Sequence, residues 1–146
     1  MRLPVLLILL AVWAGCHSHA SIPSLRPISK ISAKVREVPE LNFSAIDSVE
    51  VPEESIEEFA FLIRPVAPCT QTINPKFDYH VADVILQHPD GSTTTLLVRW
   101  TGHNPAGISL DDRNYYYGGT GKFPDGATRI VQLLNQYHFQ SLEPDD

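Results

Sequence analysis

The sequence predicts an α+β domain, a two-layer sandwich in which a helix, a four-stranded antiparallel meander sheet and a second helix follow a disordered N-terminal tether. Three observations predict it. Apolar residues recur at helical spacing after Val51, two β-rich runs flank an Asp-Gly step between Val81 and Thr101, and helical spacing returns after Gly126. Because each element must bury one apolar face, we expect both helices on the same side of the sheet.

The first 15 residues are predicted to be a signal segment. Met1-Arg2 supplies one positive charge, and Val5 to Trp13 is an unbroken apolar run. This run is too short to cross a bilayer of roughly 30 Å as a permanent helix, so it is typical of a secretory signal peptide. The sequence therefore predicts an exported protein.

The end of this segment suggests a lipid anchor. The stretch Val12-Trp13-Ala14-Gly15-Cys16 resembles the lipobox of bacterial lipoproteins, with Trp13 where that family usually has Leu. The resemblance covers only the first 16 residues. It implies that Cys16 carries a diacylglycerol and becomes the acylated N-terminus, anchored in the cell envelope. His17, in place of Asp, implies the outer membrane in a Gram-negative cell.

Ordinary signal cleavage is the alternative. Ser18-His19-Ala20 has small residues at the right spacing for cleavage after Ala20, which would give a periplasmic or secreted protein. The cysteines bear on the choice, because Cys16 and Cys69 are the only two. A lipidated Cys16 leaves Cys69 as a single thiol, whereas a free Cys16 could pair with it.

The charge balance excludes one class of partner. The chain has a formal charge of −6, and loss of Arg2 leaves 10 basic against 17 acidic residues, a net charge of −7. Nucleic acid is therefore not an expected partner. Four basic residues precede the predicted domain, and we interpret them as a solvated stretch near anionic lipid. They are Arg26, Lys30, Lys34 and Arg36.

Residues 16–49 are predicted to be a flexible tether, and residues 50–142 the domain. Ser and Pro recur in the tether without a sustained period, so it buries too little apolar surface to offset the entropy of ordering. Ile46 to Val51 could add an edge strand.

The domain opens with Pro52 and acidic residues that favour a helix start, and Pro65 ends that helix. Its apolar stripe is Ile56, Phe59, Ala60 and Ile63.

A broken stretch from Val66 to Phe77 is predicted to be a connection. Val81 to Gln87 and Thr93 to Thr101 then form a hairpin around Asp90-Gly91. In its second strand Trp100 shares a face with Leu96 and Val98, and Arg99 takes the other face. A second hairpin is predicted from Gly107 to Tyr117, turning at Asp111-Asp112-Arg113, and a closing helix from Ala127 to His138.

Sequence patterns that would indicate catalysis or metal binding are weak. Cys69 could act as a nucleophile with His80, His88, His103 or His138, but no family signature surrounds it. His17 and His19 form a pair on the tether. His80 and Asp83 are an odd number of residues apart, so a regular strand would point them to opposite faces. No metal site and no cofactor is expected.

Consecutive tyrosines give the best candidate for a binding surface. In a strand Tyr115 and Tyr117 share one face and Tyr116 takes the other, so at least one ring points away from the core. With Trp100 they are the candidate binding residues, although cross-strand packing would also explain them. The sequence thus favours a noncatalytic domain that binds a protein or peptide. A small-ligand or inhibitor-type module and a thiol-dependent enzyme using Cys69 are the alternatives.

Overall fold

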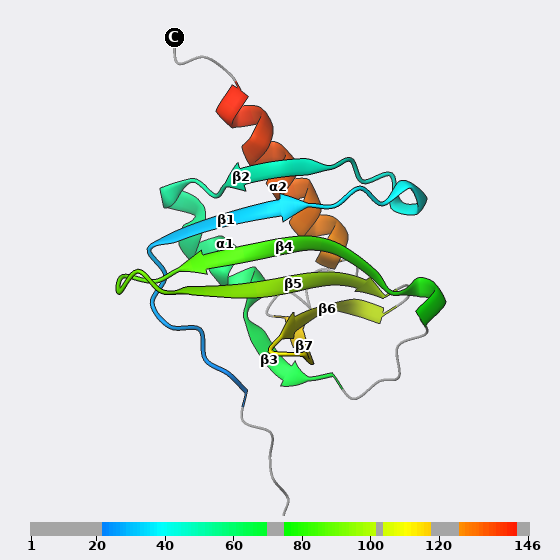
Figure 1. Cartoon of the computed structure of the whole chain (residues 1–146), viewed down its shortest axis with the longest axis horizontal. Coiled ribbons are helices and arrows are strands. Elements are labelled where there is room, and N and C mark those ends of the chain that lie inside the picture. The colour runs from blue at the N-terminus through cyan, green and yellow to red at the C-terminus, as the bar shows by residue number, and fades with distance from the viewer. Residues whose placement is uncertain (1–21, 70–74, 102–103, 118–125, 143–146) are drawn as a thin grey trace, which may run out of the picture.

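A computed structural model describes residues 22–69, 75–101, 104–117 and 126–142. In these residues the chain forms one seven-stranded antiparallel sheet, in the order β2-β1-β4-β5-β6-β7-β3, and two α-helices (Figure 1). The strands are β1 (Lys30–Val35), β2 (Ile46–Glu50), β3 (Pro65–Pro68), β4 (Tyr79–Gln87), β5 (Thr93–Thr101), β6 (Asn104–Leu110) and β7 (Arg113–Tyr117). The helices are α1 (Ile56–Ile63) and α2 (Gly126–Leu142), with short 3-10 turns at Pro39–Leu41, Glu53–Ser55 and Pro75–Phe77.

Both helices lie on one side of the sheet, behind it in Figure 1. The core fills the space between the two layers, and the rings of Phe59 in α1 and Tyr137 in α2 meet there, 6.2 Å apart. The predicted fold class and the placement of the helices agree with this arrangement. The predicted number of four strands is wrong.

Two of the additional strands come from the stretch predicted to be a tether. In β1 the side chains of Ile31, Ala33 and Val35 are buried and the intervening ones are not, so this strand has one apolar face. β1 pairs with β4 on one side and with β2 on the other. The expectation of a flexible tether is therefore corrected for residues 30–49, because burial of these apolar side chains offsets the entropy cost of ordering them. The edge strand expected at Ile46 to Val51 is confirmed as β2.

The third additional strand comes from the predicted connection after α1. The helix ends where expected, because Arg64 is already extended in front of Pro65. Instead of a loop, β3 then forms the edge of the sheet beside β7. An edge position tolerates Pro65 and Pro68, since a strand at the edge needs ladder hydrogen bonds on one side only.

Both predicted hairpins are confirmed. In the β4–β5 turn Gly91 has a φ of 81°, and the Gly91 N–H donates to the His88 carbonyl. In the β6–β7 turn Asp111 and Asp112 have φ values of 50° and 61°. Two consecutive left-handed residues match the twist of a two-residue hairpin turn, and Asp tolerates this conformation better than most residues.

The closing helix is also confirmed and extends to Leu142. Its predicted apolar stripe faces the sheet and is buried: Ala127, Ile130, Val131, Leu134 and Tyr137. No helix in the described residues is long and apolar enough to span a bilayer.

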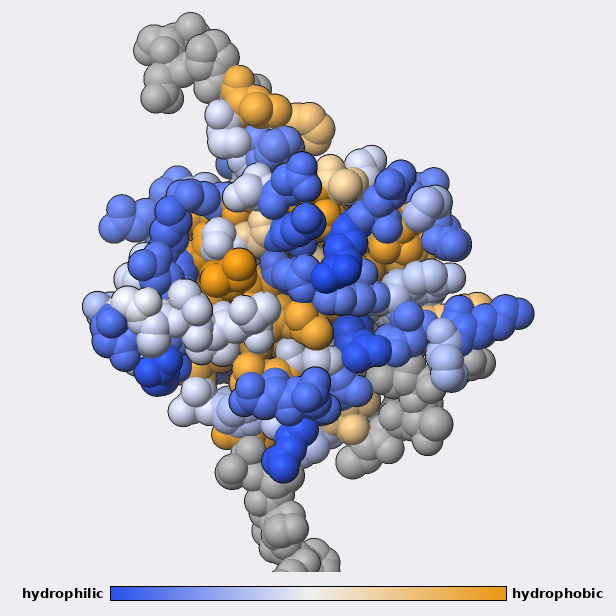
Figure 2. Space-filling model, in the orientation of Figure 1, coloured by the Kyte–Doolittle hydropathy of each residue, from blue (hydrophilic) through white to orange (hydrophobic). Residues whose placement is uncertain are grey.

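Neither helix of the described residues lies over the other side of the sheet. We call this side the uncovered face, and Figure 2 looks onto it. Hydrophilic side chains occupy most of the surface in this view, and hydrophobic ones show between them (Figure 2). The strand register determines which residues lie there.

Candidate functional site

The uncovered face is the first candidate site. Pairing across the sheet aligns Asp83, Leu97, Ser109 and Asn114 in one row. It aligns Arg99, Gly107 and Tyr116 in the next row. Directly paired residues share a face of the sheet, so these two rows bring side chains from β4, β5, β6 and β7 together.

Three charged or titratable groups meet at the β1 and β4 end of this face. The Nε2 atom of His80 lies 2.8 Å from Oδ1 of Asp83, and the Arg36 guanidinium lies 3.0 Å from Oδ2 of the same carboxylate. Asp83 is therefore shared between two partners, with 19% of its side chain exposed. This arrangement corrects the expectation that His80 and Asp83 point to opposite faces.

A β-bulge produces the correction. His80 pairs with Arg99 and Ala82 pairs with Val98, so Val81 is an extra residue in β4. The inserted residue shifts the alternation by one, which brings His80 and Asp83 to the same face. A signal was present in the sequence, because Val81 and Ala82 are adjacent, apolar and both buried, which breaks the period of two.

Arg99 forms a second ion pair on this face. Its Nε donates to Oδ1 of Asp78 at 2.9 Å, and its Nη2 contacts Oδ2 of the same carboxylate. The ion pair is bidentate, and the side chains of Arg99 and Asp78 are only 29% and 15% exposed. Two parallel contacts fix the orientation of the pair better than a single surface contact would. The uncovered face thus carries charges held in a fixed arrangement.

Tyr116 lies at the β7 end of the uncovered face. It is half-buried, and burial raises the pKa of its hydroxyl above the ordinary value, with the neighbouring Cys69 thiol adding to the rise. The side chain is therefore a neutral hydrogen-bonding group beside Cys69. Ser109 and Asn114 hydrogen-bond to one another in the adjacent row.

The other predicted aromatic residues do not join Tyr116. Tyr115 is 4% exposed and pairs with the core residue Ile108, so it lies on the side of the helices. Trp100 packs against the core and against Tyr79, with ring centres 5.9 Å apart. The Tyr117 side chain is outside the described residues. The four aromatic residues predicted to bind a partner therefore do not form one surface.

Cys69 is distant from His80, the histidine of β4. It follows β3 and donates its backbone N–H to the Asn114 carbonyl. β3 and β4 are four strand positions apart in the sheet, which corresponds to about 19 Å. His80 therefore cannot contact Cys69, and the position of His103 lies outside the described residues. Among the described residues no group of three metal-ligating side chains occurs.

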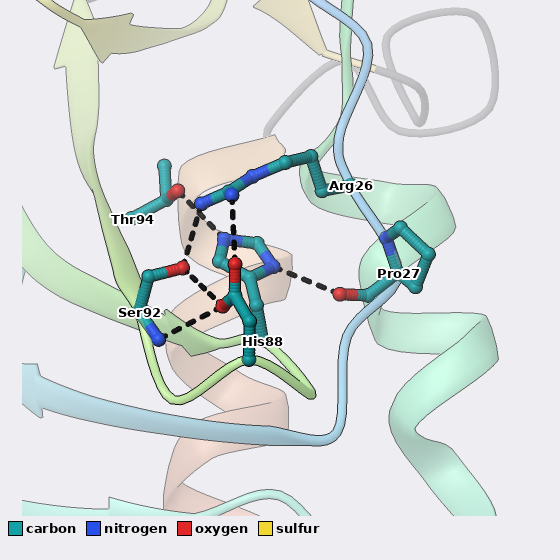
Figure 3. Close-up of polar contacts among 6 residues, drawn as sticks. Arg26, Pro27, His88, Ser92 and Thr94 are labelled. Atoms are coloured by element: carbon teal, nitrogen blue, oxygen red, sulfur yellow. Dashed lines mark hydrogen bonds and ion pairs between the residues drawn. The ribbon is translucent and has the colours of Figure 1, made fainter.

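A second polar cluster joins the N-terminal segment to the β4–β5 turn (Figure 3). His88 is 3% exposed, with Nδ1 2.8 Å from the Pro27 carbonyl and Nε2 2.8 Å from Oγ1 of Thr94. Because a carbonyl can only accept, Nδ1 carries the proton and the Thr94 hydroxyl donates to Nε2 in the neutral ring. Both ring nitrogens are thus satisfied, which is typical of a structural histidine.

Arg26 adds a charged contact on the outside of this cluster. It donates to Oγ of Ser92 at 2.8 Å and pairs with Asp90 at 3.3 Å. Hydrogen bonds from the Ser92 side chain and backbone lower the pKa of Asp90 below its ordinary value, and the charge of Arg26 lowers it further. The cluster attaches residues 26 and 27 to the turn, which is a stabilising role.

Comparison with known proteins adds no assignment. No family model matches the chain, and neither a curated protein nor a solved structure resembles it significantly.

Proposed function

We propose that this protein is an exported, lipid-anchored and noncatalytic domain that binds a protein or peptide on the uncovered face of its sheet. The observation that carries the proposal is the pattern of side chains on that face. The ion pairs Arg36–Asp83 and Arg99–Asp78 flank Leu97, which is half-buried, and Ile85 is 39% exposed beside them.

This pattern suits a partner with its own charges and apolar side chains. Protein interfaces combine an apolar centre with polar groups that set orientation, and complementary charges speed association and exclude wrong partners. Arg36 and Asp83 are already paired with one another, so covering them costs less than covering isolated charges. Tyr116 adds an aromatic ring of the kind that contributes most to binding energy.

The anchoring part of the proposal rests on the lipobox-like ending at Cys16. Mass spectrometry of the mature protein is expected to find Cys16 as the acylated N-terminus, and Cys16→Ser is expected to release the protein or leave the precursor uncleaved. An unmodified N-terminus at Ser21 would instead establish cleavage after Ala20 and remove the anchor from the proposal.

Site-specific photocrosslinking in cells tests the binding part. A photoreactive residue at Ile85, on the uncovered face, is expected to capture one partner. The same residue at Phe139, which is 66% exposed on α2, is the matched control and is expected to capture none of it. Equal capture at both positions, or none at Ile85, would contradict the proposal.

A thiol-dependent enzyme is the alternative to a binding domain. The two make different predictions for Cys69, because a catalytic thiol is a thiolate and reacts well below about pH 8. Rapid modification of Cys69 well below about pH 8 would favour the enzyme, and slow modification there would favour the binding domain. A titration of its modification rate against pH measures this directly.

A further inference from the structure

A groove runs between the N-terminal segment and α1, on the part of the domain nearest to the predicted anchor. It encloses about 730 Å³. Its walls include Ile22, Leu25, Ile28, Ala60, Phe61 and Arg64. Most of these side chains are apolar, and they come from the N-terminal segment and the α1 region. The β4–β5 turn holds the N-terminal segment through Arg26 and Pro27.

The rim of this groove exposes apolar side chains next to positive charge. Ile22 is 47% exposed and Phe61 is 40% exposed. The Arg64 guanidinium lies 4.3 Å from the centre of the Phe61 ring. No carboxylate of the described residues lies within ion-pair distance of Arg64. We call Ile22, Phe61 and Arg64 the anchor-side patch.

The chain length restricts what this patch can face. Ile22 is six residues after Cys16. Six fully extended residues span about 20 Å, so a lipid on Cys16 would keep Ile22 within that distance of the bilayer. The C-terminal end of α2 and the start of the described N-terminal segment lie at opposite ends of the domain in Figure 1. An anchored domain therefore has a near end, which carries the patch, and a far end, which carries Phe139.

We propose that the anchor-side patch docks on the surface of an anionic bilayer, with Phe61 and Ile22 at the level of the lipid headgroups and Arg64 beside the lipid phosphates. The inference rests on the lipid anchor of the proposed function. An aromatic ring with an adjacent cation is suited to this interface, because the ring has an apolar body and the cation remains with the phosphates. Docking of this kind would leave the uncovered face of the sheet open to a partner.

The charge of the patch agrees with this choice of occupant. Arg64 contributes a cation, and Arg26 contributes another whose charge is shared with Asp90. Glu57 is the acidic residue in the groove lining and offsets one of the two cations, while Arg64 has no carboxylate of the described residues within ion-pair distance. Each basic residue near an anionic surface strengthens binding about fivefold. The lipid attachment raises the local concentration of the surface, so a small patch suffices.

Fluorescence quenching by brominated lipid tests the proposal. Mature lipidated protein with Phe61→Trp, and a matched Phe139→Trp variant, are reconstituted in phosphatidylglycerol vesicles that contain brominated lipid. Both retain Trp100, so each is compared with the unsubstituted protein. The tryptophan at position 61 is expected to lose most of its added emission, and the one at position 139 is expected to keep it.

Charge is tested in the same preparation. Arg64→Gln in the Phe61→Trp background is expected to weaken docking about fivefold, and phosphatidylcholine vesicles are expected to reduce the quenching likewise. Equal quenching at both positions, or no quenching at position 61 in protein that floats with the vesicles, overturns docking and leaves the anchor intact. Failure to float overturns the anchor and the docking together. Emission at position 61 that changes with protein concentration alone identifies a second copy as the occupant and overturns the proposal.

Discussion

His80 and Asp83 lie on one face of β4, with Nε2 and Oδ1 2.8 Å apart, although a regular strand would separate them. The extra residue Val81 causes this by shifting the alternation of side chains between His80 and Ala82. The same carboxylate also accepts a hydrogen bond from Arg36, which directly follows β1. Asp83 therefore links the β4 histidine to the end of β1. Bulges recur where a strand must redirect a side chain, and here the result is a charged cluster on the uncovered face.

Tyr115 and Tyr116 are expected to respond differently to alanine. Tyr115→Ala removes a buried ring opposite Ile108 and is expected to lower the free energy of unfolding by about 3 kcal/mol. Tyr116→Ala is expected to weaken partner binding by about 1 to 2 kcal/mol, roughly tenfold, with little change in Tm. Urea denaturation and a binding titration with the crosslinked partner measure the two effects. A loss of stability in both variants with no specific loss of binding would contradict the assignment of Tyr115 to the core and Tyr116 to the binding surface.

His88 is expected to be the stabilising residue of the cluster in Figure 3. His88→Leu leaves the Pro27 carbonyl and the Thr94 hydroxyl without their partner, at a cost of about 2 to 3 kcal/mol in the free energy of unfolding. Arg26→Ala is the control in the same cluster, and its exposed ion pair should contribute less than about 1 kcal/mol. Chemical denaturation distinguishes them, and equal effects would show that the buried hydrogen bonds are not decisive.

Asp90 is expected to titrate below the ordinary range of a carboxyl. Its pKa is lowered first by the Ser92 side chain, then by the Ser92 backbone and by Arg26. A depressed pKa means that the contribution of Asp90 to stability is present above the ordinary carboxyl pKa and is lost as pH falls through the lowered value. NMR titration of the Asp90 carboxyl carbon measures this midpoint.

A comparison of two variants identifies the cause of the Asp90 shift. Ser92→Ala should return the midpoint further toward the ordinary value than Arg26→Ala does, since the Ser92 hydroxyl has the larger effect. The reverse order would mean that the charge of Arg26 dominates.

The two N-terminal strands are expected to resist trypsin in the native protein. Lys30, Lys34 and Arg36 have side chains about half exposed, at 47%, 55% and 50%. Their backbone is nevertheless held in or directly after β1, which is paired on both sides, so cleavage requires local unfolding. Mass spectrometry of a time course should find these bonds intact in buffer and cut in urea. Early cleavage at Lys34 would contradict the placement of β1 in the sheet.

Local patterns were sufficient for the central part of the fold. The apolar stripes of α1 and α2 and the turn residues Gly91 and Asp111 to Asp112 are signals that depend only on neighbours in sequence. β1 also has such a signal, because apolar and polar residues alternate through Lys30–Val35. That signal was outweighed by the Ser and Pro residues around it, which favour disorder when composition is averaged over a longer stretch.

The remaining features depend on contacts between distant residues. β3 has two prolines in four residues, and only its pairing with β7 makes it a strand. The assignment of Tyr115 to the core and Tyr116 to the uncovered face follows from the register with Ile108 and Gly107, which alternation alone leaves undetermined. The groove beside α1 requires that residues 22–28 return to the domain, and no periodicity in that segment predicts it.

The prolines of β3 have a consequence for how copies of the protein meet. In this strand only Val66 and Ala67 possess a backbone N–H, because Pro65 and Pro68 have none. A strand from another molecule would therefore find an incomplete ladder at this edge of the sheet. Edge strands that lack donors in this way discourage polymerisation into extended sheets, which matters for proteins concentrated together on a surface. Replacing Pro68, whose side chain is exposed, would weaken this protection against aggregation without altering a buried residue.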